Sequence, residues 1–402
     1  MNTQGNRLYF PLIDLLRACA ALLVIVYHVI VIGEWTSFPV EGWWFLLFRV
    51  GWIGVDLFFV ISGFVIALTA LAAYDRSGSH FMPEYFKRRW LRIAPLYFCT
   101  LLIYLFLVDP SLLMLGYKSA MLHIVSHLLF IHNLLPTTHG SINGPNWSVA
   151  LEMQFYVMIA LLTPWLSRVS PIRLILLFIS IAIGYRYCTT LLLPPGSAST
   201  LSQHVYSTLL PGTLDAFGSG IVLAILITRA KYSKAAGFLS PSWRNAACWG
   251  GISLVMIYPT WTIFWSTADY WSSTLMISLW KTALALSFTS VLALSMTLPI
   301  QRLTLLQPAL YLGRISYGLY LWHLPVLHSL LQLDWPDKRG LLAMTLTCTI
   351  ILSAASWHFF EKLFLKDKPT KHDQNELKQS NAAGTAMKKP DDHASAVGKG
   401  AT

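Results

Sequence analysis

One apolar stretch near the start of the chain carries ionisable side chains that could take part in acid–base or anion chemistry. The segment 12–32 contains Asp14, Arg17 and His28. In an α-helix, Arg17 and His28 differ by only about 20° around the axis and lie roughly 16 Å apart along it. Asp14 precedes Arg17 by one turn, a spacing that allows an ion pair. The sequence therefore predicts a helix with one polar face.

Two carboxylates in other apolar stretches are candidate partners for these groups. Asp56 lies early in one stretch, and Glu152 lies about 9 Å inside the start of another if that stretch is helical. We expect Glu152 to lie at the depth of His28, because a carboxylate and an imidazole lining one cavity can form a general acid–base pair. The alternative for Glu152 is a structural ion pair with Arg186 or Lys281.

Hydroxyl and imidazole groups recur at helical spacing around these acids. Ser148 and Tyr156 stand four residues on either side of Glu152, so the three share one helix face. In a later stretch, Tyr320 and His323 are three residues apart and also share a face. These groups are predicted to support the site. The alternative for His323 is a buried histidine that serves packing alone.

A compact cationic cluster precedes the third apolar stretch. It consists of Lys87, Arg88, Arg89 and Arg92. Arg89 and Arg92 are three residues apart and could grip one phosphate group together, since guanidinium groups match the fork geometry of phosphate oxygens. The alternative is charge that sets topology and contacts anionic lipid headgroups.

Other kinds of reactive site have weaker support in the sequence. His123 and His127 have a spacing that could bind zinc, but no third ligand lies close by, and we predict no metal site. The chain contains no G-x-S-x-G, no Walker loop and no H-E-x-x-H. No covalent nucleophile of a standard kind is evident.

The composition is that of a membrane protein. The 402 residues are 55% hydrophobic and 12% charged, whereas a soluble domain is typically about 25% charged. The net charge of +11 could suggest nucleic acid, but its distribution along the chain has another explanation, which excludes nucleic acid as a partner.

The apolar stretches predict an all-α polytopic protein with about ten transmembrane helices. The expected spans are 12–32, 54–73, 93–108, 147–166, 172–192, 209–228, 246–265, 274–297, 315–333 and 341–360. With both termini in the cytoplasm, the outer loops hold few basic residues, namely Arg49, Lys118, Lys338 and Arg339. This asymmetry follows the positive-inside rule and accounts for the high net charge.

Two segments fall outside this span pattern. Counting 119–136 as a span would invert every later loop, so we expect an interfacial or re-entrant helix on the outer side. From Lys366 onward the chain is polar and predicts a disordered cytoplasmic tail. The expected organisation is one membrane domain, 1–365, followed by the tail, 366–402.

Taken in order, these motifs resemble the acyltransferase-3 family of integral-membrane acyltransferases. The resemblance rests on the R-x10-H spacing of Arg17 and His28 and on GVDLFFVISGF, RRWLRIAPLY, NWSVALEMQFY and SYGLYLWH, and it runs from about residue 10 to residue 360. It implies a fold of about ten helices that moves an acyl group, usually acetyl from acetyl-CoA, onto an extracytoplasmic glycan hydroxyl. It places the protein in a bacterial inner membrane, with membrane lipids, acyl-CoA and a surface or lipid-linked glycan as partners.

By position, the resemblance also implies roles for particular residues. His28 and Arg17 match the pair that is essential in the family, and Arg89 and Arg92 match its R-x-x-R motif for the cytoplasmic donor. Glu152 matches the acid of the WS-x-x-x-E motif. That motif often ends in two acids, and Met153 here replaces the second.

These lines combine into one hypothesis and one rival. The coenzyme phosphates dock at Arg89 and Arg92, with Arg88 beside them, and the thioester reaches His28. There the imidazole, positioned by Asp56 or Glu152, deprotonates the acceptor hydroxyl, either directly or by way of an acyl-histidine. The rival is a proton-coupled transporter or flippase of a glycan or lipid-linked sugar, since intramembrane ionisable groups are also what such a carrier needs.

Overall fold

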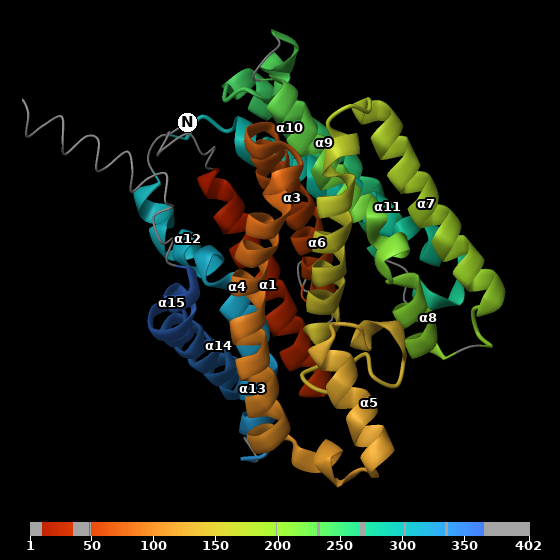
Figure 1. Cartoon of the computed structure of the whole chain (residues 1–402), viewed down its shortest axis with the longest axis vertical. Helices are drawn as coiled ribbons and strands as arrows, with labels where there is room; N and C mark the ends of the chain where they lie inside the picture. Colours follow the sequence, from red (N-terminus) through yellow and green to blue (C-terminus); the bar gives the residue numbers. More distant parts are fainter. Residues whose placement is uncertain are drawn as a thin grey trace, which may run out of the picture.

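In a computed structural model of the chain, every element of the described part is helical (Figure 1). The structure describes residues 10–34, 48, 50–197, 199–230, 234–265, 270–300, 303–333 and 337–365. The segment 366–402, predicted to be a disordered tail, lies outside the described residues, so the division of the chain at residue 365 stays a prediction.

The longer helices follow the predicted apolar stretches closely. They are α1 Pro11–Ile32, α3 Gly54–Ser77, α4 Met82–Ile103, α6 Asn146–Leu166, α7 Pro171–Leu192, α9 Leu214–Ala230, α10 Trp243–Pro259, α11 Thr274–Thr297, α13 Ser316–Leu331 and α14 Lys338–Ser356. Shorter elements used below are the helices α5 Tyr117–Leu128, α8 Thr200–Ser207, α12 Gln307–Arg314 and α15 Lys362–Leu365, and the turns η1 Gly51–Ile53, η6 Leu210–Thr213, η9 Tyr270–Ser272 and η11 Trp357–Glu361.

The described residues form eight helical segments that are long and apolar enough to cross a membrane, where ten were predicted. Seven of the eight coincide with single predicted spans. The eighth, Gly51–Val108, contains both 54–73 and 93–108, because α3 and α4 are joined by only a short turn. The predicted span 315–333 corresponds to α13, whose 16 residues fall short of the length that a straight crossing needs. The protein is therefore a multi-pass membrane protein.

The segment 119–136 does not form a membrane-crossing helix. Its helical part, α5, has 12 residues and a length of about 18 Å, well short of a 30 Å hydrocarbon core. After α5 the chain continues through turns as far as Asn146. Excluding this segment from the predicted spans was correct.

Helices α1 and α3 lie in the middle of the molecule, with α7, α8 and α11 on one side and α12, α14 and α15 on the other (Figure 1). Glycines allow the central helices to pack closely. A side chain at Gly54 would collide with the backbone of Ala20, and one at Gly313 would collide with the backbone of Asp14. Helix α1 is therefore held between α3 and α12, which fixes how its polar face is presented.

Candidate active site

A pocket opens between α1, α3, α4, α6 and α13. Its empty space, together with the solvent at its open mouth, amounts to about 800 Å³. The charged side chains that line it are Arg17, Arg89, Arg92 and Glu152. Hydroxyl groups complete its polar wall: Ser62, Ser148, Tyr156, Ser316, Tyr317 and Tyr320. The pocket is thus a cationic site inside an apolar bundle.

Two of its guanidinium groups are held by hydroxyl groups. Arg17 Nε donates to Ser316 Oγ at 3.3 Å, which joins α1 to the start of α13. Arg89 Nη2 donates to Thr69 Oγ1 at 3.2 Å, which joins α4 to α3. A hydroxyl partner is neutral and does not cancel the charge of a guanidinium group, although the carboxylates of Asp14 and Glu152 lie close enough to offset part of the charge of Arg17. Both side chains therefore remain able to bind an anion.

The other two arginines of the predicted phosphate cluster differ in their surroundings. Arg92 lines the pocket, and its Nη1 lies 3.4 Å from Glu361 Oε2. Arg88 does not line the pocket. Its side chain is 41% exposed and its Nε bonds to Glu84 Oε1 at 2.7 Å, one turn earlier on α4. The structure places Arg88 outside the pocket, because its position on α4 directs it away from the bundle, and its part in donor binding stays a prediction.

Glu152 lies in the arginine-lined pocket and not beside His28. Its Oε1 accepts hydrogen bonds from Ser62 Oγ at 2.7 Å and from Tyr156 OH at 2.8 Å. The pocket lining includes Arg17 but neither His28 nor His323. The prediction that Glu152 matches His28 in depth is therefore wrong.

The reason is that α6 begins inside the molecule. Asn146, its first residue, is fully buried, and Asn143 just before it donates from Nδ2 to Leu321 O at 3.1 Å. The loop between α5 and α6 covers this helix start. Glu152, about 9 Å further along α6, consequently lies deeper in the bundle than a helix starting at the surface would place it.

His28 pairs with a second histidine. Its Nδ1 lies 2.9 Å from Val24 O, one turn earlier, and 3.2 Å from His323 Nε2 on α13. His323 is fully buried, and its Nδ1 lies 2.7 Å from Tyr320 O. Tyr320 lines the pocket, and its ring centroid is 5.8 Å from that of His323. One side chain therefore separates the pocket from the histidine pair.

These contacts assign the protons of the neutral pair. A carbonyl oxygen only accepts, so the hydrogen bonds to Val24 O and Tyr320 O require a proton on Nδ1 of each ring. The one Nδ1–H of His28 is then shared between two acceptors, Val24 O at 2.9 Å and His323 Nε2 at 3.2 Å. His28 Nε2 carries the lone pair, which is the arrangement that a general base or a nucleophile needs.

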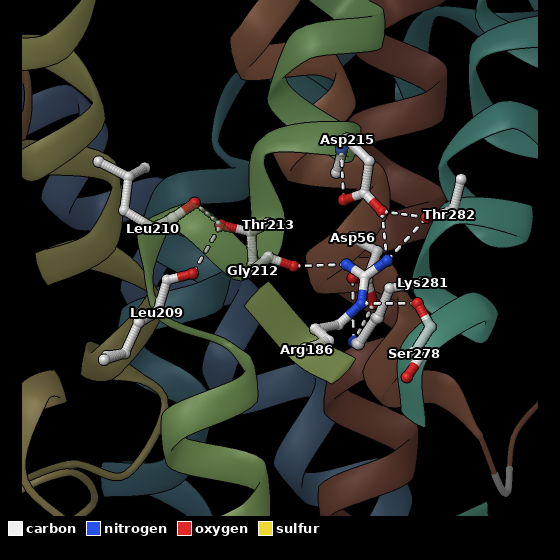
Figure 2. Close-up of polar contacts among 11 residues, drawn as sticks. Asp56, Arg186, Leu209, Leu210, Gly212, Thr213, Asp215, Ser278, Lys281 and Thr282 are labelled. Carbon is white, nitrogen blue, oxygen red and sulfur yellow. Dashed lines mark hydrogen bonds and ion pairs between the residues drawn. The ribbon is translucent and has the colours of Figure 1, made fainter. Parts of the chain in front are cut away.

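Asp56 belongs to a separate buried network (Figure 2). Both of its carboxylate oxygens accept from Lys281 Nζ, at 3.0 and 2.9 Å. Arg186 Nη2 bonds to Asp215 Oδ2 at 2.8 Å and to Thr282 Oγ1 at 2.7 Å. Further hydrogen bonds of Arg186 run to the carbonyl oxygens of Ser278 and Gly212.

This network answers two questions left open by the sequence. Arg186 and Lys281 pair with Asp215 and Asp56, so the predicted alternative of an ion pair with Glu152 is wrong. The carboxylate contacts of Asp56 are with Lys281 and not with His28, so the expectation that Asp56 orients His28 is also wrong. The groups within hydrogen-bond distance of His28 Nδ1 are Val24 O and His323 Nε2.

Several histidines lie in α5 and in the loop between α5 and α6, and they bear on the stability of this region. His127 Nδ1 donates to His123 O at 2.8 Å, and the His127 ring stacks on that of His132 with 3.8 Å between the centroids. Burial lowers the pKa of His127 to about 4 and that of His139 to about 4. In the described part of the chain, no three His, Cys, Asp or Glu side chains are grouped to hold a metal ion.

Sequence reasoning missed two residues at the site. Ser62, within the motif GVDLFFVISGF, donates from Oγ to Glu152 Oε1. Glu361 contacts Arg92 from 269 residues away in the sequence. It lies just past the end of the last predicted span. An acidic residue at the end of a predicted span was a signal that the sequence offered. Its partner Arg92 could not be inferred from the spacing of nearby residues.

The sequence matches a family of acyltransferase domains over residues 10–358. The peptidoglycan O-acetyltransferase OatA of Listeria monocytogenes is 28% identical over 381 residues, which cover 89% of this chain and 56% of that protein. The O-acetyltransferase OatA of Staphylococcus aureus is 27% identical over 332 residues, which cover 79% of this chain and 51% of that protein. The chain thus spans about half the length of these curated relatives. No solved structure gives a significant match.

Proposed function

The chain belongs to the acyltransferase-3 family, and from this premise we propose that it transfers an acetyl group from cytoplasmic acetyl-CoA to a hydroxyl group of an extracytoplasmic glycan. The glycan acceptor is proposed because the two relatives above are named O-acetyltransferases, one of them for peptidoglycan. The observation that carries the proposal is the pocket with three guanidinium groups, one side chain away from a histidine pair.

The donor is proposed to bind through its phosphates. Arg89 and Arg92 stand one turn apart on α4 and both line the pocket. Guanidinium groups bind phosphate oxygens in pairs of parallel hydrogen bonds. A neutral sugar moved by a flippase has no anionic group for such a cluster to bind. Arg17, further along the same pocket, is placed to contact the pantetheine arm or the developing negative charge.

The chemical step is proposed at His28. Nε2 of His28 takes the proton of the acceptor hydroxyl while the hydroxyl oxygen attacks the thioester carbonyl carbon. The carbon–sulfur bond breaks, the thiolate of coenzyme A leaves, and the proton on His28 Nε2 returns to that thiolate. His323 holds the ring of His28 in the required tautomer through its Nε2.

The orientation of the chain follows from this assignment. Donor binding at Arg89 and Arg92 requires that end of α4 to face the cytoplasm, as the distribution of basic residues predicts. His28, roughly 16 Å further along α1 than Arg17, then lies toward the outer side.

The test uses membranes containing the full chain, acetyl-CoA labelled in the acetyl group, and cell-envelope glycan. Wild-type membranes should transfer label to glycan, and a His28→Ala variant that retains the wild-type thermal stability should lose at least about a hundredfold in rate. His80→Ala, at an exposed histidine outside the pocket, is the matched control and should retain full activity. Substantial transfer by His28→Ala would refute the assignment, and glycan movement without label would favour a carrier.

A further inference from the structure

Arg92 contacts more side chains than the other arginines of α4 do. Its Cζ lies 5.8 Å from the ring centroid of Tyr317 on α13 and 5.2 Å from that of Trp357 in η11. Its Nη1 lies 3.4 Å from Glu361 Oε2, at the end of the same turn as Trp357. Two aromatic rings and one carboxylate therefore surround a guanidinium group that also lines the pocket.

Glu361 is a buried carboxylate whose place in the fold brings it to Arg92. Its side chain is 4% exposed, so its charge requires a partner. Its second oxygen, Oε1, accepts from Ser356 Oγ at 3.4 Å. Residues 357–361 form a π-helical turn between α14 and α15, and such turns inside α-helices often mark functional sites.

The contact with Glu361 uses Nη1 of Arg92. It leaves Nε and Nη2, which lie along one edge of the guanidinium group. A guanidinium group presents parallel N–H donors along its Nε–Nη2 edge, and that edge fits two oxygens of one phosphate. The bond from Nη1 to Glu361 fixes the rotation of the group about its stem. Arg89, by contrast, bonds through Nη2 to the hydroxyl of Thr69.

We propose that Glu361 is a positioning residue for the donor: it holds Arg92 so that the Nε–Nη2 edge faces the pocket and grips a phosphate of coenzyme A. The inference rests on the proposed function for the identity of the donor. Glu361 does not itself line the pocket, and the cation of Arg92 stands between its carboxylate and the site. The Arg92 cation therefore offsets the repulsion between this carboxylate and a bound phosphate.

The first measurement is the affinity of the purified full chain for coenzyme A by isothermal titration calorimetry. Glu361→Ala should raise Kd roughly tenfold, and Glu361→Gln, which keeps the volume and a hydrogen-bond acceptor, should raise it less. The matched control is Glu84→Gln, which removes the carboxylate partner of Arg88 on the same helix but outside the pocket. This control should bind coenzyme A as wild type does.

A second measurement separates positioning from a merely structural role. In an Arg92→Lys background the fork is absent, so adding Glu361→Gln should change Kd by less than about twofold. Tighter binding by Glu361→Ala would identify the carboxylate as a competitor of the phosphate and overturn the proposal. Additive losses in the double variant, or an unchanged Kd in both single variants, would also overturn it.

These experiments distinguish a failure of the role proposed for Glu361 from a failure of the proposed acyl transfer. A wild-type chain that binds coenzyme A but transfers no label would refute acyl transfer and leave the role of Glu361 standing. A wild-type chain that transfers label while both Glu361 variants bind coenzyme A normally would refute the role of Glu361 alone.

Discussion

Arg88 and Arg89 are neighbours in the sequence but have opposite surroundings. Arg89 lines the pocket and bonds to a hydroxyl group on α3, whereas Arg88 is exposed and already paired with Glu84. The sequence analysis placed both in one cationic cluster, because a run of basic residues does not show which side chains face the bundle. Once α4 is placed against the bundle, one helical step of about 100° decides which of them can meet a ligand.

This difference gives a paired prediction. Arg89→Lys keeps the charge but loses the fork, so KM for acetyl-CoA should rise about tenfold with a small change in kcat. Arg88→Lys should leave both constants unchanged. The measurement is the initial rate of label transfer at varied acetyl-CoA. Equal effects of the two variants would mean that general positive charge, and not a shaped site, binds the donor.

The close packing of neighbouring helices depends on glycines at positions where no side chain fits. A Cβ at Gly220 of α9 would collide with the backbone of Val60 and Gly63 on α3, and one at Gly63 would collide with the backbone of Phe217. These are backbone atoms and cannot move aside as a side chain would. Small residues of this kind are what close helix packing in a membrane uses.

Gly220→Ala should therefore lower the stability of the bundle by about 1–3 kcal/mol, as overpacking does. Gly184→Ala on α7 is the matched control, because a Cβ there meets no atom within 4 Å. That variant should be as stable as wild type or slightly more so, since alanine favours helix. Thermal unfolding of the purified chain measures both. A Gly220→Ala protein as stable as Gly184→Ala would contradict the close contact between α3 and α9.

The loop before α6 should make stability depend on pH. Burial lowers the pKa of His139 from 6.5 to about 4, and its ring stacks on Trp147 at 5.1 Å. The unfolded chain therefore binds a proton more readily than the folded chain does. The stabilising effect is complete above pH 6.5 and is lost as the pH falls from 6.5 to 4.

His139→Gln should reduce the slope of the unfolding temperature against pH between 6.5 and 4, and His127 accounts for part of the slope that remains. His80→Gln, at an exposed histidine outside the loop, should leave the dependence as in wild type. Unfolding temperatures of the three proteins across that range decide the matter. An unchanged slope in His139→Gln would show that other groups cause any acid sensitivity.

For the whole molecule, periodicity and hydropathy predicted most helices, and the order of motifs predicted the family. They could not predict how deep in the bundle each side chain lies. Glu152 and His28 were expected at one level because both helices were assumed to begin at the membrane surface. The loop before α6 buries Asn146, so α6 starts inside the bundle and that assumption fails. Partners far apart in the sequence, such as His28 with His323, likewise required the packed structure.

The buried ion pairs show how the separate helices are held in register. The network of Asp56, Lys281, Arg186 and Asp215 joins α3, α7, α9 and α11, and each of the four side chains is at most 8% exposed. Each charge is tolerable only because its partner is in place. We therefore expect the acids of this network to serve the packing of the bundle and to take no part in the chemistry of the pocket.

Lys281→Met should leave Asp56 as an uncompensated buried charge and cost about 3–5 kcal/mol of stability. The double variant Asp56→Asn/Lys281→Met removes both charges and should recover most of that loss, because the remaining groups are neutral. The exposed pair of Glu84 and Arg88 is the control, and breaking it with Arg88→Met should have little effect on stability. If the recovered double variant also transfers acetyl groups, Asp56 takes no part in the reaction. If it is stable yet inactive, the separation of packing from chemistry is refuted.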